Sequence, residues 1–258
     1  MDRILLEVGR HPLAFVEDKK FVEYSKDIAE RVCKYIDLAE GNQVLLSLGS
    51  SSVGDFKTLR RGKDFESEAL NSVYGAAHYL NNRELLKRVL MIVRRIRNVY
   101  KKRNVDIAIH SPMNGSFISD FKKSLSAVGL TRTSTFKVYA IIDNPTEVIM
   151  ADDILESKID GLVLNMPRIV RVMQGFDIND SEARYNLGVN SAFKIVDAVV
   201  DITRNTPRRV VVMTENNKDL IKYCIQMGVY GISVSYKDVK DCRRLVSDEE
   251  AKLILGKK

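Results

Sequence analysis

Polar residues directly follow several short apolar segments of this sequence, and such positions are where ligand chemistry is expected. They are Gly49, Ser50, Ser51 and Ser52 of GSSSVG, His110 of HSP, Asp143 of DNP, Asn165 of NMP and Glu215 of TENN. The GSSSVG loop could cradle a phosphate group with its backbone N–H groups. It lacks the Gly-Lys-Ser/Thr ending of a P-loop and the spacing of a dinucleotide fingerprint, so a plain flexible loop is an equally good interpretation.

The acidic and imidazole side chains could support metal or proton chemistry. Asp143 and Glu215 offer the hard oxygen ligands that Mg²⁺ prefers, although solvated loop acids would look the same in a sequence. His110 could exchange a proton, although a single histidine at a strand end more often makes a structural hydrogen bond. No Ser/His/Asp or Cys/His arrangement is evident. Mg²⁺ is therefore the one cofactor for which the sequence offers ligands.

The composition predicts a cytoplasmic globular protein with no membrane partner. Hydrophobic residues make up 45% and charged residues 29% of the 258 residues, so a substantial core is expected. The N-terminus lacks a signal-peptide pattern, and no apolar run approaches the roughly 20 residues that span a bilayer. Cys33, Cys224 and Cys242 lie far apart with no CxxC spacing, which indicates buried thiols rather than a disulfide or zinc site.

Short apolar, β-branched segments recur along the chain and predict strands that are buried on both faces of a parallel sheet. Six are clear, and a seventh at residues 3–8 is weaker. The six clear segments are residues 43–48, 105–109, 136–142, 161–164, 209–213 and 231–234. Polar residues that follow parallel strands gather at one end of a barrel or an open sheet, where ligands bind in both architectures.

Amphipathic segments between these strands predict helices. The alternation implies right-handed βαβ units, and the absence of a linker or repeat predicts one domain over residues 1–258. The predicted helices are residues 21–38, 83–102, 118–127, 146–156, 183–202 and 218–227, with a C-terminal helix at 248–255.

The predicted helix 83–102 carries much of the net charge of +7. Its basic residues repeat every seven positions, and apolar residues cover the opposite side. The basic rows are Lys87, Arg94 and Lys101, and Arg88, Arg95 and Lys102; the apolar residues are Leu86, Leu90, Val93 and Ile96. This face is either the solvated side of an outer helix or a docking surface for an acidic protein or a phosphate backbone. No nucleic-acid motif accompanies it, so a nucleic-acid partner is not favoured.

Several stretches, in the same order, resemble the C-terminal domain of the phosphoenolpyruvate synthase and pyruvate phosphate dikinase family. The resemblance runs from about residue 4 to residue 236 and favours an α/β fold of the (β/α)₈ TIM-barrel type. The stretches are residues 9–15, 55–58, 74–79, 105–109, 142–145, 150–154, 160–165, 173–177 and 230–234.

The resemblance implies a site for pyruvate or phosphoenolpyruvate. In that family, Mg²⁺ and arginines neutralise phosphate, carboxylate and enolate charge, which suits the charge that develops during the reaction. A cysteine handles the proton at the methyl or methylene carbon, and a phosphohistidine on a separate domain carries the phosphoryl group. We expect this stand-alone chain to lack that domain and the nucleotide-grasp domain.

Other residues occupy the positions that match the family's catalytic residues. The family's metal-binding glutamate corresponds to Asp143, and its second metal ligand, an aspartate, corresponds to Met166. The catalytic cysteine corresponds to Met213 and one arginine to Tyr74. Methionine offers neither the hard oxygen that Mg²⁺ prefers nor a proton to exchange. These replacements predict a non-catalytic barrel with a binding or regulatory role, so no catalytic residue is assigned.

Two other interpretations stay open. The first is a divergent enzyme that acts on a small anionic 2-oxo acid or phosphate ester, with Asp143 and Glu215 as metal ligands. The second is a nucleic-acid or scaffold protein that uses helix 83–102.

Because only six strands are clear, the barrel is expected to be incomplete, and exposed sheet edges are usually covered. The sequence therefore also predicts a homo-oligomer or a second protein subunit.

Overall fold

The computed structural model describes residues 3–7, 18–49, 73–176 and 189–256. The chain divides into two compact units, residues 1–140 and 141–258, and the boundary lies within strand β4 (Val138–Ile142). The single domain expected over residues 1–258 stays a prediction.

Unit 1 contains a parallel ladder of strands that follow one another in chain order. Its strands are β1 (Arg3–Glu7), β2 (Gln43–Leu48) and β3 (Val105–His110). The N–H of Ile107 donates to the carbonyl of Lys137 at 3.1 Å, just before β4 begins. Every residue of β3 is buried, as expected for a strand within a parallel sheet, and the buried Asp106 accepts the Lys137 N–H.

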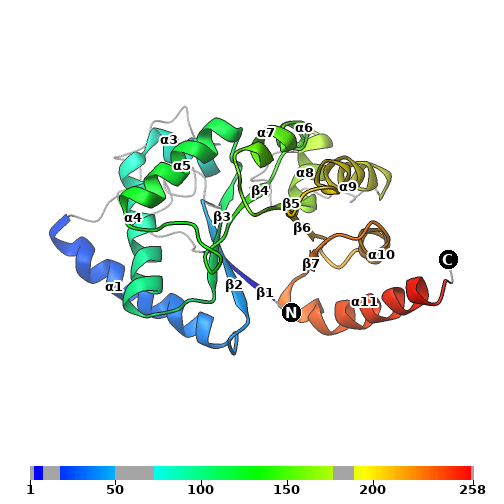
Figure 1. Cartoon of the computed structure of the whole chain (residues 1–258), viewed down its shortest axis with the longest axis horizontal. Coiled ribbons are helices and arrows are strands. Elements are labelled where there is room, and N and C mark those ends of the chain that lie inside the picture. The colour runs from blue at the N-terminus through cyan, green and yellow to red at the C-terminus, as the bar shows by residue number, and fades with distance from the viewer. Residues whose placement is uncertain (1–2, 8–17, 50–72, 177–188, 257–258) are drawn as a thin grey trace. The chain divides into compact units, whose positions relative to one another are not determined.

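Helices cover this ladder (Figure 1). The long helix α1 packs against α4 and the π-helical turn η4, and these two segments together bury the predicted apolar side chains. The helices of unit 1 are α1 (Asp18–Asp37), α3 (Gly75–Asn81), α4 (Arg83–Arg94), η4 (Arg95–Val99) and α5 (Gly115–Ala127).

The prediction of one regular helix over residues 83–102 is wrong in its second half. The α-helix ends at Arg94, and the chain continues as a π-helix that ends at Val99. The Arg97 side chain gives the reason, because it is buried and donates to the carbonyls of Arg103, Val105 and Thr135. The chain therefore curls back over its own helix end, and Lys101 lies outside the helix.

Unit 2 repeats the alternation of parallel strands and helices. Its ladder joins β5 (Gly161–Asn165), β6 (Arg209–Met213) and β7 (Gly231–Ser233). Its helices are α6 (Pro145–Ile149), α7 (Ala151–Glu156), α8 (Met166–Met173), α9 (Val189–Thr203), α10 (Lys218–Gln226), the 3₁₀ turn η5 (Tyr236–Asp238) and α11 (Val239–Ile254).

Helix boundaries in unit 2 differ from the predicted ones. The helix expected at 146–156 is split at Met150 into α6 and α7, and α11 begins at Val239 rather than at residue 248. The first residues of the helix expected at 183–202 lie outside the described residues, and α9 begins at Val189. Two short helices, α3 and α8, were not predicted from the sequence.

The fold is an α/β fold of the TIM-barrel type, as predicted. Seven strands are described rather than eight, so the barrel is incomplete over the described residues, and the weaker segment at residues 3–8 does form β1. Within the described parts of the chain, no helix has both the length and the apolar character needed to cross a bilayer.

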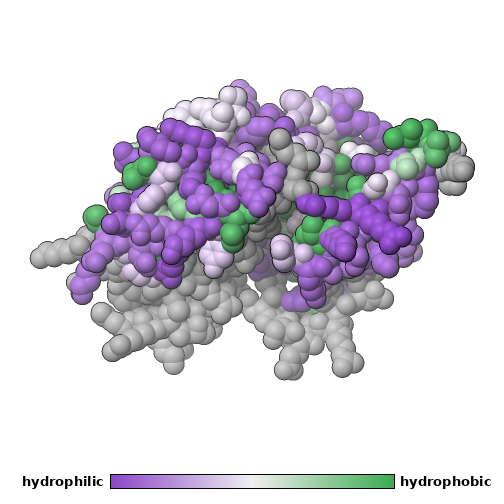
Figure 2. All heavy atoms as spheres, turned by 90° about the horizontal axis from the view of Figure 1, so that it is seen from below, coloured by the Kyte–Doolittle hydropathy of each residue, from purple (hydrophilic) through white to green (hydrophobic). Residues whose placement is uncertain are grey.

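Apolar side chains are left uncovered at the end of α11. Leu253, Ile254 and Leu255 are 47%, 85% and 69% exposed. Figure 2 shows hydrophobic residues gathered at this free end of the helix, next to largely hydrophilic surface. Since α11 packs mainly on α10, its last turn has little to bury these side chains against.

Candidate functional site

A buried carboxylate lies at the carboxyl end of β4 in unit 2. Asp143 directly follows the strand and is fully buried. Asn165, the last residue of β5, donates from Nδ2 to Asp143 Oδ1 at 2.7 Å. The two residues that the sequence placed after neighbouring strands therefore do come together. The amide donor supplies part of the compensation that a buried charge requires.

A second buried carboxylate, Glu147, was missed in the sequence. The backbone N–H of Asp143 donates to Glu147 Oε2 at 2.9 Å, and the N–H of Glu147 donates to Asn144 Oδ1 at 3.1 Å. Asn144 thus caps α6, with Pro145 in its first turn. The pattern Asn-Pro-Thr-Glu has the three-residue spacing of a capping box, and that spacing is the signal that could have revealed Glu147.

The two methionines that the resemblance places at catalytic positions, Met166 and Met213, have different surroundings. Met166 begins α8 and is fully buried, so its sulfur belongs to the core. Met213 ends β6, lies in register with Asn165 on β5, and is half-buried. Neither side chain can bind or release a proton at ordinary pH, so the strand ends in unit 2 carry no acid–base group at these positions.

The described residues do not assemble a metal site. No three His, Cys, Asp or Glu side chains of the described ranges form a group that could hold a metal ion. Glu215 is exposed, with a left-handed backbone at φ 47°, and the carboxylate that contacts the Asp143 segment is Glu147 instead. Asp143 Oδ1 already receives the Asn165 amide. Mg²⁺ binding at Asp143 stays a prediction, and no chemistry is derived through it.

Unit 1 has its own polar pair near the carboxyl ends of its strands. His110 ends β3, and its Nε2 lies 2.7 Å from Ser47 Oγ on β2, with both side chains buried. The Tyr74 ring is tilted by 57° against the His110 ring, with the centroids 6.4 Å apart. The sequence indicated His110 but missed Ser47, although a lone serine in QVLLSL is the type of residue that a buried hydrogen bond requires.

Two glycines allow the backbone segments of this site to approach closely. Gly75 has φ +62°, and a Cβ there would lie 2.5 Å from the carbonyl oxygen of His110. The Gly75 N–H donates to the carbonyl of Gly49 at 3.1 Å, and Gly49 has φ +84°. Gly49 is the only described residue of GSSSVG, because Ser50, Ser51 and Ser52 lie outside the described residues.

The backbone after His110 adopts left-handed conformations that residues with side chains seldom adopt. Ser111 has φ 47° and Met113 has φ 65°. Such conformations cost free energy and persist where the surrounding structure fixes them, which is common at functional sites. The surrounding structure therefore fixes the backbone at the end of β3, where His110 contacts Ser47, Tyr74 and Gly75.

The cysteines are buried, as the sequence predicted. All three are free and buried. Burial raises the pKa of Cys224 to about 12 and also raises the pKa values of Cys33 and Cys242. Because the thiolate is the reactive form, these thiols are poor nucleophiles and poor metal ligands at neutral pH.

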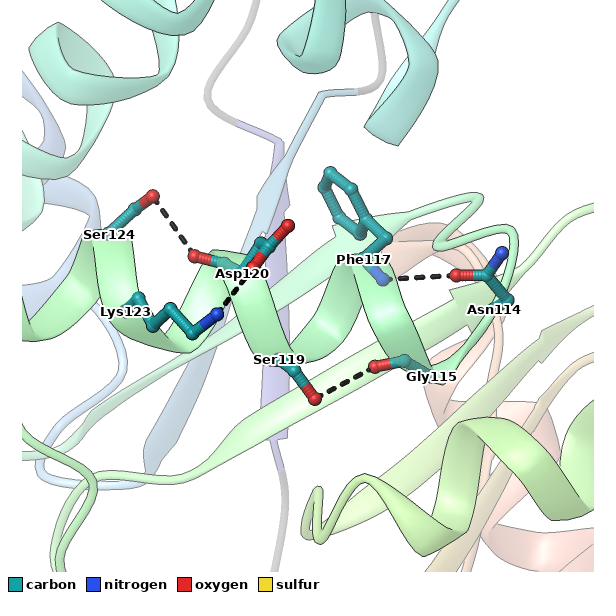
Figure 3. A network of polar contacts seen from close by, with 7 residues as sticks. All are labelled: Asn114, Gly115, Phe117, Ser119, Asp120, Lys123 and Ser124. Carbon is teal, nitrogen blue, oxygen red and sulfur yellow. Dashed lines mark hydrogen bonds and ion pairs between the residues drawn. The ribbon is translucent and has the colours of Figure 1, made fainter.

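A hollow of about 580 Å³ lies on α5. It is lined by Ser119, Lys122, Lys123, Ser126 and Ala127. Lys123 Nζ lies 2.9 Å from Asp120 Oδ1, and the Ser119 hydroxyl donates to the Gly115 carbonyl. Figure 3 marks both contacts. Lys123 and Ser119 of this lining therefore already have partners within α5.

Comparisons with known proteins agree with the fold. No protein-family model matches the chain. The chain is 19% identical to a phosphoenolpyruvate synthase from Aeropyrum pernix over 262 residues, which covers 96% of this chain and 32% of that protein. It is 20% identical over 261 residues to a phosphoenolpyruvate synthase from Pyrococcus furiosus, with 98% and 32% covered. The chain thus spans about a third of the length of these curated relatives.

One solved structure shares the fold at low sequence identity. RipC from Yersinia pestis superimposes with a TM-score of 0.51 and 8% identity, covering 95% of this chain and 88% of that one. At such low identity the likeness concerns the fold alone.

Proposed function

We propose that this chain, a divergent homologue of the phosphoenolpyruvate synthase barrel domain, is a cytoplasmic protein that binds a small anionic ligand at its strand ends. Its role is binding or regulation rather than phosphoryl transfer. The observation that supports this proposal most is Met213 beside Asn165 on neighbouring strands, in the position of the family's proton-transferring cysteine. The ligand class is a 2-oxo acid or a phosphate ester related to pyruvate or phosphoenolpyruvate.

The described residues support binding better than turnover. Asn165 carries both a donor and an acceptor at the end of β5, and its amide is oriented by Asp143. Asp143 and Glu147 are buried, and both accept N–H groups within the fold. A side chain that fixes the ends of strands can position a ligand without reacting with it.

Turnover assays test the proposal that this chain does not catalyse phosphoryl transfer. The purified chain is expected to form no phosphoenolpyruvate from pyruvate and ATP, measured by ³¹P NMR. Met213→Cys is expected to leave this result unchanged, because Met166 and Tyr74 remain at the other matching positions. ATP-dependent turnover by the wild-type chain would contradict the proposal.

Ligand binding is tested by calorimetric titration with pyruvate, phosphoenolpyruvate and inorganic phosphate, with and without Mg²⁺. We expect at least one of these anions to bind and Asp143→Ala to weaken its Mg²⁺-dependent binding. Asn205→Ala is the matched control, because Asn205 is exposed in another part of unit 2. If Asp143→Ala leaves the ligand affinity and its dependence on Mg²⁺ unchanged, Asp143 does not take part in metal binding. If none of the anions binds the wild-type chain, the ligand class is wrong.

The divergent-enzyme alternative has one specific observation in its favour. The buried imidazole of His110 is hydrogen-bonded to Ser47 at a strand end, next to the left-handed backbone of Ser111. An imidazole can act as an acid or a base in a reaction. An enzyme that uses it would consume a 2-oxo acid or phosphate ester, and His110→Gln would abolish that turnover. Screening such compounds by NMR separates this alternative from pure binding.

Association with a second copy of the chain or another subunit is part of the proposal. The uncovered apolar end of α11 and the incomplete set of strands support it. Val211 and Met213 on β6 are also only half-buried. Apolar surface of this kind is favourable to bury against a partner.

A further inference from the structure

The positive charge of this protein is concentrated in one segment of unit 1. Residues 83–140 contain thirteen lysines and arginines but only three acidic residues, Glu84, Asp106 and Asp120. The other 200 residues contain 28 basic and 31 acidic residues. The net charge of +7 therefore arises from α4, β3, α5 and the turns between them.

Several of these cations have structural partners within the fold. Lys87 and Arg88 both lie near Glu84, and the Arg88 guanidinium lies 5.3 Å from the centroid of the Phe21 ring. Arg97 is buried among backbone carbonyls, where burial lowers the pKa of its guanidinium. The basic rows predicted along one helix are thus divided between core, ion pairs and exposed positions.

Exposed cations and exposed apolar side chains occur together in two segments, the end of α1 and the turn before β3. Tyr35 and Leu38 at the end of α1 are 57% and 74% exposed, and Val99 at the end of η4 is 62% exposed. The ion pair between Lys102 and Asp37 joins these two segments. We refer to the surface formed by Lys34, Tyr35, Leu38, Val99, Lys101 and Arg103 as the Tyr35–Arg103 patch.

The backbone beneath this patch is firmly held. Arg97 donates to the carbonyls of Arg103 at 3.2 Å and Thr135 at 3.1 Å. Asn104 Nδ2 donates to the carbonyl of Asn42 at 2.8 Å, which ties together the turns before β2 and β3. Tyr100 donates to Glu30 on α1 at 2.9 Å. A surface fixed in this way loses little conformational entropy on binding.

We propose that the Tyr35–Arg103 patch docks an acidic protein surface. Cations at a helix end can be explained by the helix dipole, and this suffices for Lys34, in the last turn of α1. It does not explain Lys101 and Arg103, which follow the end of η4 and are exposed. None of the residues of the patch belongs to the proposed ligand site.

The apolar residues distinguish a protein partner from a nucleic acid. Nucleic-acid surfaces combine cations with polar groups that reach phosphates, and their interfaces are more polar than protein interfaces. Protein interfaces combine arginine and tyrosine with buried apolar groups. Leu38 and Val99 would gain free energy by burial against a protein but have no role along a phosphate backbone. Acidic residues on the partner would complement Lys34, Lys101 and Arg103.

The test measures fluorescence anisotropy of a labelled random Glu–Tyr copolymer, with poly-glutamate, single-stranded poly-uridylate and duplex DNA as comparison probes. It is run at about 150 mM salt so that distant charges are screened. We expect the copolymer to bind, and Lys101→Glu with Arg103→Glu to weaken its affinity at least roughly tenfold. Leu38→Ser with Val99→Ser should weaken copolymer binding several-fold but leave poly-glutamate binding unchanged.

Arg243→Glu with Arg244→Glu is the matched control, because it removes the same type of charge from exposed positions on α11. Its copolymer affinity should equal that of the wild type. If Lys101→Glu with Arg103→Glu does not fold, as judged by circular dichroism, the glutamine pair at the same positions replaces it. Tighter binding of poly-uridylate or DNA, lost in the same variant, would identify a nucleic-acid surface and overturn the proposal. Absence of copolymer binding would overturn it as well.

Discussion

The amide of Asn165 and the carboxylate of Asp143 connect the ends of β5 and β4 through one short hydrogen bond. The carboxylate is fully buried, so each donor that faces it matters more than it would at the surface. Under the proposed function, a ligand at these strand ends would meet an amide that Asp143 already orients.

Replacing Asn165 with alanine tests this contact. Asn165→Ala removes a donor from a buried carboxylate, so we expect the free energy of unfolding to fall by about 1–3 kcal/mol. Urea denaturation followed by circular dichroism measures the change. Asn205→Ala, at an exposed position, should stay within about 0.5 kcal/mol of the wild type. Equal stabilities of the two variants would show that the amide contributes nothing to holding Asp143.

The sequence indicated some of these residues and missed others for a physical reason. Asp143, Asn165 and His110 directly follow predicted strands, and parallel strands bring their carboxyl ends together. Glu147 lies within a helix, and Ser47 within an apolar strand, so neither occupies a position that suggests a ligand site. Their partners are distant or backbone groups, which appear only once the chain is folded.

At the scale of the element, α3 is held against the ends of β2 and β3 by contacts that only glycine permits. Gly75 starts α3 with φ +62°, its N–H bonds to Gly49, and its Cα faces the backbone of His110. Tyr74, the residue before it, packs beside the His110 ring. The local geometry of the unit 1 site therefore depends on one backbone approach.

Gly75→Ala should be strongly destabilising. The added Cβ would lie 2.5 Å from the His110 carbonyl oxygen, and the backbone would have to shift to relieve this clash. Gly41→Ala is the control, because Gly41 also has a left-handed φ of +83° but meets nothing within 4 Å. The control should lose about 1 kcal/mol from conformation alone. Gly75→Ala should lose roughly 1–3 kcal/mol more from overpacking, measured by thermal and urea denaturation. Equal losses would mean that the approach is not constrained.

Elements were predicted well where packing follows the sequence pattern and poorly where a distant contact intervenes. Strands β2 and β6 have the predicted bounds, because a run of apolar residues is both the signal and the cause of burial. The helix from residue 83 has the predicted buried side, but it changes to a π-helix at Arg95. That change coincides with the burial of Arg97 beneath Phe136, a contact that no local pattern encodes.

At the scale of the whole molecule, charge and apolar surface are distributed unevenly along the chain. Positive charge gathers between residues 83 and 140, while uncovered apolar side chains gather at the end of α11. The alternation of apolar and amphipathic segments predicted the α/β class, and the family resemblance predicted the barrel type. These surface features depend instead on which side chains the described elements leave exposed. Each of the two surfaces therefore calls for its own experiment.

The end of α11 is the surface that we expect to drive association between chains. Leu253, Ile254 and Leu255 expose apolar area that favours burial by about 25 cal/mol per Å². Sedimentation velocity at micromolar concentration should show a dimer or larger assembly, and Leu253→Ser with Ile254→Ser should shift it toward monomer. Tyr236→Ser is the control, since Tyr236 is 96% exposed but lies before α11. The control should sediment like the wild type, because removing an isolated exposed ring does not change the apolar end of the helix. A wild-type chain that remains monomeric over this concentration range would contradict self-association, and a partner of different sequence would then have to cover this helix.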